Sequence, residues 1–303
     1  MYYNNETKEN CMKKMKNWRP SASLLAGAAV LGLLVLLVPI VRIMRDAVPF
    51  SDDYGYGYFA KLGYLMGKNL PGVLMGVWEN VKHTWWTWQG TYSSIFLMSL
   101  VPLVWGEQYY FWGLLFILLL LIGGVFALVK ALVVDVLQGG WQQCLYIQAV
   151  TAALVVELMY YPAEGLFWYN GGIHYVGMHG FAMLLLASLI CLSEGKKGRI
   201  RKGLLIAASM ILSLIVAGSN YVTALQTFLV FLTIMVAGAL LHRNIKGLLR
   251  LVPAFCVYSI GFFLNLAAPG NTARAEALGN PGMAPLQAIL FSFKEAFSHM
   301  WEY

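Results

Sequence analysis

Residues 109–132 read YYFWGLLFILLLLIGGVFALVKAL, a run in which Lys130 carries the only charge. A helix of about 20 mostly apolar residues is long enough to cross the hydrocarbon core of a bilayer. Similar runs recur along the chain, and together they predict membrane spans at 22–41, 109–132, 142–160, 176–193, 203–219, 221–241 and 249–267. We therefore expect an all-α, polytopic helical membrane protein with about seven transmembrane helices and additional interfacial helices.

The composition of the 303-residue chain excludes an ordinary soluble domain. Hydrophobic residues make up 59% of it, charged residues only 12%, and the mean hydropathy is +0.66. Soluble domains carry about 25% charged residues. The net charge of +7 is explained by basic residues that orient a chain in the membrane. We accordingly expect membrane lipid, and no nucleic acid, as a partner.

Basic residues predict the orientation of the chain, because lysine and arginine collect on cytoplasmic loops. They cluster at 8–19, 194–202 and 243–250, which places the N-terminus in the cytoplasm. We expect a basic cytoplasmic segment at 1–21 and a single transmembrane domain at 22–303, with 22–41 retained as a signal anchor. The outer loops are then 45–108, 161–175 and 268–285. The count of crossings requires that the short apolar stretch 93–105, which contains Pro102, does not span.

The first outer loop carries an acidic pair, Asp52 and Asp53, followed by Tyr54 and further tyrosines and glycines. Neighbouring carboxylates repel, so that one of them can have a raised pKa or share a cation. Either state suits a general base that takes a proton from an acceptor hydroxyl. A pair of solvated acids, or a cap for the next helix, would explain the same residues.

Aromatic and amide side chains gather in the same outer region. The first outer loop contains Trp88, and loop 161–175 contains the set Trp168, Asn170, His174 and Tyr175. Rings and amides of this kind suit the recognition of a carbohydrate or a lipid headgroup. An interfacial aromatic belt and a packed turn are the structural alternatives.

Two further polar segments lie at predicted outer helix ends. One is the turn that contains Asn220, and the other is the segment with Asn271 and Arg274. Arginine binds phosphate in a bidentate manner, so Arg274, and secondarily Arg42 or Arg45, could hold a lipid-linked phosphate. Ordinary headgroup contact and a simple helix–helix turn are the alternatives. The chain has no Walker lysine loop, no HExxH and no GxSxG motif, which leaves soluble nucleotide chemistry unsupported.

The ordered set of these segments resembles a known family. The segments are Ser51-Asp52-Asp53-Tyr54, Trp88-Gln89-Gly90-Thr91-Tyr92, Phe167-Trp168-Tyr169-Asn170-Gly171 with Tyr175, Gly218-Ser219-Asn220, and Ala268-Pro269-Gly270-Asn271 with Arg274. They resemble an uncharacterised bacterial family of glucosyl transferase-like polytopic membrane proteins, which is similar to the GT-C glycosyltransferase superfamily. The resemblance extends from about residue 20 to the C-terminus. It departs from the family at 89–91, where Gln-Gly-Thr replaces Asn-Gly-Arg, and family members are usually longer.

The resemblance implies a GT-C-like fold and a membrane glycosyltransferase in the bacterial cytoplasmic membrane. Its donor would be a polyprenyl-phosphate-linked sugar, its acceptor a glycan of the cell envelope, and its acidic residue Asp52 or Asp53. The residues at Tyr54, Trp88, Trp168, Asn170, His174, Tyr175, Asn220, Asn271 and Arg274 are then expected to bind substrate. No metal ligand set is predicted and no cofactor is indicated, although a divalent cation is left open. The alternatives are a non-catalytic protein that binds or translocates lipid-linked glycans, and a structural assembly component.

Overall fold

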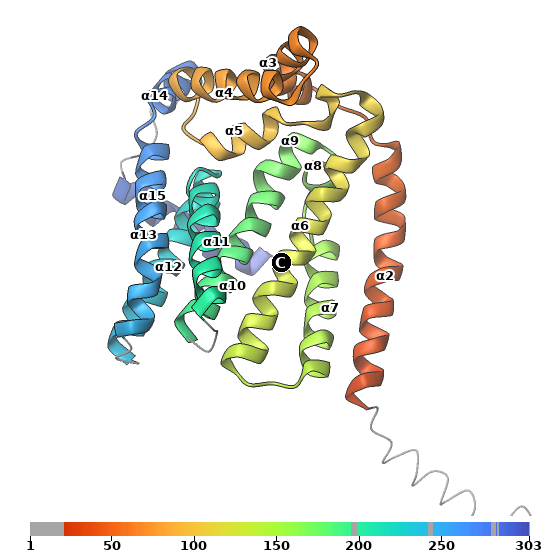
Figure 1. Cartoon of the computed structure of the whole chain (residues 1–303), viewed down its shortest axis with the longest axis vertical. Coiled ribbons are helices and arrows are strands. Elements are labelled where there is room, and N and C mark those ends of the chain that lie inside the picture. Colours follow the sequence, from red (N-terminus) through yellow and green to blue (C-terminus); the bar gives the residue numbers. More distant parts are fainter. Residues whose placement is uncertain (1–20, 195–198, 242–244, 280–282, 284, 303) are drawn as a thin grey trace, which may run out of the picture.

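The computed structural model describes residues 21–194, 199–241, 245–279, 283 and 285–302, and this part of the chain is helical throughout, without a strand. Figure 1 shows long helices standing side by side, with shorter helices lying across one end of the bundle. The long helices are α2 (Ala22–Asp46), α6 (Tyr110–Lys130), α7 (Trp141–Glu157), α10 (Met178–Glu194), α11 (Arg199–Ala217), α12 (Tyr221–Leu241), α13 (Ile245–Leu266) and α15 (Pro285–Glu302). The shorter helices are α3 (Asp52–Gly67), α4 (Leu70–Thr87), α5 (Tyr92–Ser99), α8 (Pro162–Leu166), α9 (Tyr169–Gly171) and α14 (Pro269–Ala277).

Irregular turns extend several of these helices. Two are 3₁₀ turns that precede α6, η1 (Pro102–Val104) and η2 (Glu107–Tyr109). Two are π-helical, η3 (Ala131–Val136) at the end of α6 and η4 (Gly172–Gly177), which joins α9 to α10. A π turn contains one more residue than an α turn and is frequent at functional sites.

Six helical segments of the described chain are long and apolar enough to cross a membrane. They are Ala22–Asp46, Glu107–Val136, Tyr169–Ser193, Ile200–Ala217, Tyr221–Leu240 and Ile245–Ala277, and they match six of the seven predicted spans. The seventh prediction, 142–160, corresponds to α7, a helix of 17 residues that packs against α2 and α6. The structure therefore supports a multi-pass membrane protein with six candidate spans in the described chain, and the crossing by α7 stays a prediction.

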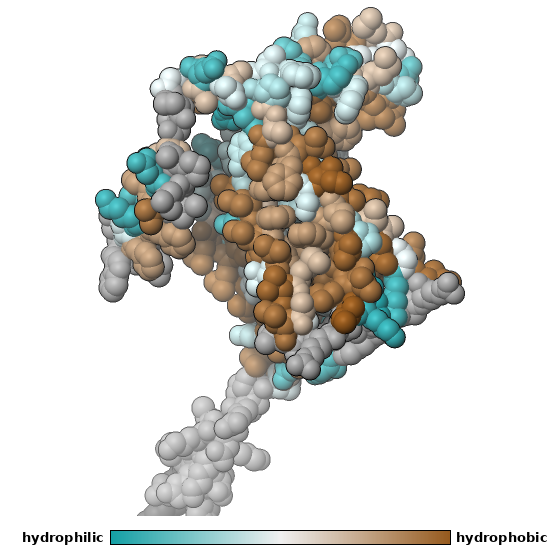
Figure 2. All heavy atoms as spheres, turned by 90° about the vertical axis from the view of Figure 1, so that its left-hand side faces the viewer, coloured by the Kyte–Doolittle hydropathy of each residue, from teal (hydrophilic) through white to brown (hydrophobic). Residues whose placement is uncertain are grey.

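The first span shows why the bundle needs lipid around it. Ser21 begins α2 as its N-cap, accepting a hydrogen bond from the backbone N–H of Leu24 at 3.2 Å. Only 11% of the apolar window of α2 is buried, and Leu31, Val35 and Val38 are each 63% exposed. Exposing such side chains to water is unfavourable by about 25 cal/mol per Å². Figure 2 views the molecule from the left-hand side of Figure 1. Hydrophobic residues cover the middle of this face, and hydrophilic residues lie toward its upper end.

The three predicted outer segments lie at one end of the bundle. Helices α3, α4 and α5 cross the top of Figure 1, with α14 beside α4 and α8 and α9 beneath them. As expected, the stretch 93–105 does not span, because α5 ends at Ser99 and Pro102 starts a separate 3₁₀ turn. This end of the molecule is therefore built from segments that are far apart in the sequence.

Two glycines allow the turn after α4 to contact the end of α13 and the start of α14. A Cβ atom on Gly90 would lie 1.9 Å from the carbonyl oxygen of Asn265, and one on Gly270 would lie 2.5 Å from the backbone nitrogen of Trp88. At both points backbone touches backbone directly, and a residue with a Cβ atom would not fit. This contact brings Trp88 and Gln89 next to α14, and so next to Arg274.

Replacing Gly270 by alanine should therefore separate α14 from α4. We expect Gly270→Ala to lower the free energy of unfolding by about 1–3 kcal/mol, the usual effect of overpacking, measured as a lower midpoint of thermal unfolding in detergent. The matched control is Gly203→Ala in α11, where an added Cβ meets no atom within 4 Å. Equal midpoints for the two variants would show that the contact between α14 and α4 is not tight.

Candidate functional site

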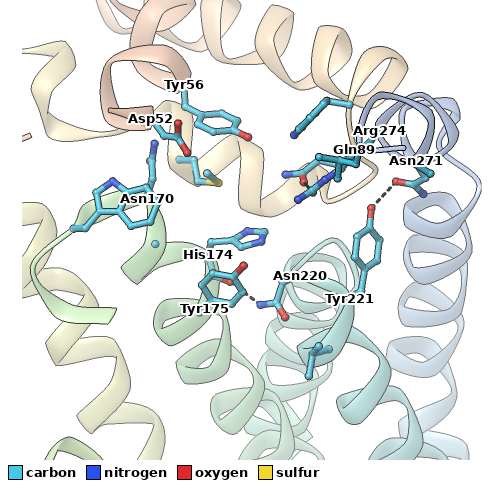
Figure 3. A pocket seen from close by; sticks show the side chains of 17 residues that line it. Asp52, Tyr56, Gln89, Asn170, His174, Tyr175, Asn220, Tyr221, Asn271 and Arg274 are labelled. Carbon is cyan, nitrogen blue, oxygen red and sulfur yellow. Dashed lines mark hydrogen bonds between the residues drawn. The ribbon is translucent and has the colours of Figure 1, made fainter. Parts of the chain in front are cut away.

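A cavity of about 890 Å³ opens beneath the crossing helices at this end of the bundle. Figure 3 shows side chains from α3, the end of α4, the α9–η4 segment, the start of α12 and α14 turned toward it. Its lining is Asp52, Tyr56, Trp88, Gln89, Met98, Trp168, Asn170, Gly171, His174, Tyr175, Asn220, Tyr221, Val222, Asn271, Arg274, Ala275 and Leu278. One carboxylate, Asp52, and one guanidinium, Arg274, are the charged groups in this lining.

The cavity brings together most of the residues that the sequence singled out. Nine of them line it: Asp52, Trp88, Trp168, Asn170, His174, Tyr175, Asn220, Asn271 and Arg274. Asp53 and Tyr54 do not, and neither do Arg42 and Arg45 in the last two turns of α2. The three segments predicted to be outer loops thus converge on one cavity, which is the geometry that a shared site requires.

The two neighbouring acids have opposite surroundings. Both lie in the first turn of α3, where negative charge is favoured by the helix dipole. Asp52 is exposed and lines the cavity, and its carboxylate accepts a hydrogen bond from the Ser51 hydroxyl at 3.5 Å. Asp53 has no exposed surface. Of the pair, only Asp52 can reach a bound molecule.

Asp53 instead joins three segments of the chain. Its carboxylate accepts hydrogen bonds from the Tyr110 hydroxyl at 2.6 Å, from the backbone N–H of Phe50 at 3.0 Å and from the backbone N–H of Asn170 at 3.1 Å. The Tyr110 hydroxyl in turn accepts from the backbone N–H of Tyr169 at 2.9 Å. Burial raises the pKa of the Asp53 carboxyl above its ordinary value, although the three hydrogen bonds oppose this shift. The predicted catalytic role does not fit these contacts, which are those of a positioning residue.

Tyr54, predicted to bind substrate, points away from the cavity. Its ring is 51% exposed, and its hydroxyl donates to Glu107 at 3.3 Å. Tyr56 takes the place expected for Tyr54, because it lies one helical turn after Asp52 and shares its face of α3. Burial, followed by the negative charge of Asp52, raises the pKa of the Tyr56 phenol, while Arg274 opposes the shift. The phenol therefore stays protonated at neutral pH and can donate a hydrogen bond.

Arg274 is held in place from two sides. Its guanidinium donates to the side-chain oxygen of Gln89 and lies over the Trp88 ring, 5.2 Å from the ring centroid. A cation on a tryptophan face is held by the quadrupole of the ring. Gln89 was not among the predicted site residues. The remaining guanidinium donors suit an anion such as phosphate.

Asn271 ties α14 to its neighbours. Its amide donates to the carbonyls of Asn265 and Leu266, each at 3.0 Å. Its side-chain oxygen accepts from the backbone N–H of Gly90 at 2.9 Å and from the Tyr221 hydroxyl. Asn271 therefore positions Arg274, one helical turn further along α14, rather than offering free hydrogen-bonding groups to a ligand.

Asn220 has a similar positioning role at the start of α12. Its side-chain oxygen accepts from the backbone N–H of Thr223 at 2.9 Å, as an N-cap does. Its amide donates to the carbonyl of His174 at 2.7 Å, which fixes the π turn η4 against α12. This hydrogen bond therefore links two of the segments that line the cavity.

A second, apolar groove lies on the other side of the last turns of α4. Its volume is about 550 Å³, and its lining is Trp78, Val81, Lys82, Trp85, Trp86, Tyr92, Ser93, Phe96, Leu97, Leu214, Ile215 and Leu264. Trp85 lines this groove and Trp88 lines the cavity, three residues apart on the same helix. The groove faces the spans α11 and α13, so a hydrocarbon chain from the membrane fits its chemistry.

The raised pKa of Asp53 predicts a pH-dependent stability. The folded protein binds this proton more tightly than the unfolded chain, so the stability contributed by protonated Asp53 is complete below pH 3.8 and is lost as the pH rises through the raised pKa. Asp53→Asn cannot ionise. At pH 4 we expect its midpoint of thermal unfolding to lie below that of the wild type, because one hydrogen-bond acceptor is lost. As the pH rises above 4, the difference between the two midpoints should become smaller, because only the wild type loses stability on ionisation. Asp52→Asn is the control, and parallel pH curves for the wild type and Asp53→Asn would contradict the assignment.

No family model, curated protein or solved structure matches this chain. A function for the protein is therefore inferred from the cavity, the adjoining groove and the resemblance of the ordered segments.

Proposed function

We propose that the protein is a GT-C-like membrane glycosyltransferase. It transfers a sugar from a polyprenyl-phosphate-linked donor to an acceptor of the cell envelope, on the outer face of the bacterial cytoplasmic membrane. The observation that supports this proposal is the placement of one free carboxylate, Asp52, and one braced cation, Arg274, in the same cavity at one end of an apolar bundle.

The two charged groups fit the two changes in charge that the reaction requires. The acceptor oxygen forms a bond to the anomeric carbon of the sugar, and its proton passes to the Asp52 carboxylate. The bond between the anomeric carbon and the phosphate oxygen breaks, and its electron pair stays on that oxygen. Polyprenyl phosphate leaves with one more negative charge than it had in the donor, and Arg274 stabilises that charge.

The surroundings of the cavity fit a donor that remains in the membrane. A polyprenyl chain is a long hydrocarbon, and the apolar groove lined by Trp85 suits it chemically. Trp88, three residues further along the chain, lies against Arg274. Helices α3, α4 and α5 cover the end of the spans, where a lipid phosphate would lie at the interface. A sugar on that phosphate would then project into the cavity.

Substitution of Asp52 tests the enzymatic role directly. We expect Asp52→Asn to lower sugar transfer about 10²- to 10⁴-fold, the usual contribution of a general base, while the protein inserts and unfolds as the wild type does. The measurement is the release of polyprenyl phosphate from polyprenyl-phosphate hexoses in nanodiscs with cell-envelope membranes as acceptor.

The matched control for this variant is Asp46→Asn, which removes an exposed acid at the end of α2, outside the cavity. It should retain full activity. Donor binding by a wild-type protein that releases no polyprenyl phosphate would instead support a protein that only binds lipid-linked glycans.

Cysteine labelling tests the proposed sidedness and the crossing by α7. Gln138 and Glu164 are exposed and lie on either side of α7. With the four native cysteines replaced, we expect Glu164→Cys to react with a membrane-impermeant maleimide in intact cells and Gln138→Cys to react only after permeabilisation. Labelling of both in intact cells would mean that α7 does not cross, and the reverse pattern would place the cavity in the cytoplasm.

A further inference from the structure

Polar atoms without a hydrogen-bond partner are concentrated on one wall of the cavity. Eight buried side-chain nitrogen or oxygen atoms of the described residues have no partner. Four of them belong to only three residues, two in the α9–η4 segment and one directly before it. They are Trp168 Nε1, Asn170 Nδ2, Asn170 Oδ1 and His174 Nδ1. All three residues line the cavity, and Asn170 has no exposed surface.

This concentration is unusual for a folded protein. Buried polar groups are almost always paired, because an unpaired one loses its hydrogen bonds to water and gains none in return. The other four unpaired atoms are single atoms on Thr91, Ser94, Ser213 and Asn265. Asn170 differs from them because both ends of its amide lack a partner.

The backbone of this wall is nevertheless firmly held. The backbone N–H of Asn170 donates to Asp53, and the backbone N–H of Tyr169 donates to Tyr110. The carbonyl of His174 accepts from Asn220. The main chain is therefore fixed while four polar atoms of the side chains stay unpaired, which is the arrangement of a preorganised binding site.

We infer that the wall formed by Trp168, Asn170 and His174 is a subsite for the hydroxyl groups of a neutral sugar ring. This inference rests on the proposed function and specifies which part of the donor binds where. Figure 3 shows Asn170 on the same side of the cavity as Asp52, whereas Arg274 and Gln89 lie across from them. The phosphate binds at Arg274, and the ring extends from it toward Asn170.

The chemistry of the three side chains specifies the ligand. An amide offers a donor and an acceptor side by side, which matches two neighbouring hydroxyl groups, since one can accept while the other donates. The indole N–H of Trp168 donates only, and the imidazole of His174 provides one more polar nitrogen. None of the three is a carboxylate, a lysine or an arginine, the side chains that pair most strongly with a charged sugar. A neutral hexose with free vicinal hydroxyls fits this set, and a uronic acid does not.

Binding measurements on the full chain in nanodiscs test the subsite without turnover. The probes are farnesyl phosphate and its glucosyl, mannosyl and galactosyl derivatives, and the quantity measured by calorimetry is the ratio of affinities with and without the sugar. For at least one hexose we expect the wild type to bind about tenfold more tightly than it binds farnesyl phosphate. Asn170→Ala should bring this ratio close to one and leave the affinity for farnesyl phosphate unchanged, whereas Arg274→Gln should weaken both probes.

The matched control is Asn80→Ala, which removes a buried amide that is paired. Asn80 donates to the Tyr56 carbonyl at 3.1 Å and to the Ser99 hydroxyl at 2.8 Å, and it lies outside the cavity lining. It should lower the midpoint of thermal unfolding and keep the affinity ratio, whereas Asn170→Ala should keep the midpoint, because no hydrogen bond is lost. Trp168→Phe, which removes only the indole N–H and keeps an aromatic ring, should lower the ratio partly.

The possible results test the sugar subsite independently of the proposed enzymatic activity. A wild type with no preference for any of the three hexoses overturns the subsite, as does an unchanged ratio in Asn170→Ala. An Asn170→Ala midpoint as low as that of Asn80→Ala also overturns it, since the amide would then be structural. If the ratio falls as expected but Asp52→Asn leaves sugar transfer intact, the subsite stands and the proposed catalytic role of Asp52 is wrong.

Discussion

The arrangement of the cavity depends on the buried carboxylate of Asp53. Its hydrogen bonds join the start of α3, the start of α6 through Tyr110, and the start of α9 through the backbone of Asn170. These three points belong to segments more than 50 residues apart, and the Tyr110 hydroxyl reinforces the junction by accepting from the backbone of Tyr169. Burial disfavours a charge in this position, and the hydrogen bonds to both carboxylate oxygens offset part of that cost. The same bonds set the direction in which Asp52 and the α9–η4 wall face.

On the opposite side of the cavity, direct backbone contacts join the segments, as the Asp53 carboxyl does on the first side. Gly90 lets the turn after α4 touch the end of α13, and Gly270 lets it touch α14. Asn271 completes the junction with hydrogen bonds to Gly90 and to the last carbonyls of α13. Arg274 follows one turn later and is braced by Trp88 and Gln89. A carboxylate and a guanidinium therefore face each other across the cavity without forming an ion pair in the described structure.

Hydropathy predicted six of the spans well, because a bilayer demands the same apolar length from every crossing helix. α7 was less certain, since its apolar run shortens to a helix of 17 residues. The basic loops and the parity of crossings predicted that three distant segments share one end, and that is where the cavity lies. The role of each neighbouring acid was not predictable, because a step of one residue on a helix turns a side chain by about 100°. If a helix is assumed to start at Asp52, its periodicity places Tyr56 on the same face, so this residue was predictable. The hydrogen bond between Arg274 and Gln89 was not, because it arises only from the contact between α14 and the end of α4.

The hydrogen bonds of Asn271 have a mechanical consequence. Because this side chain holds the last carbonyls of α13 and the turn after α4 together, α14 cannot shift independently of α13. Transmembrane helices adjust their tilt to the thickness of the surrounding hydrocarbon layer. A thicker or thinner membrane that reorients α13 therefore also displaces the guanidinium of Arg274, and the lipid composition becomes one of the variables that set the geometry of the cavity.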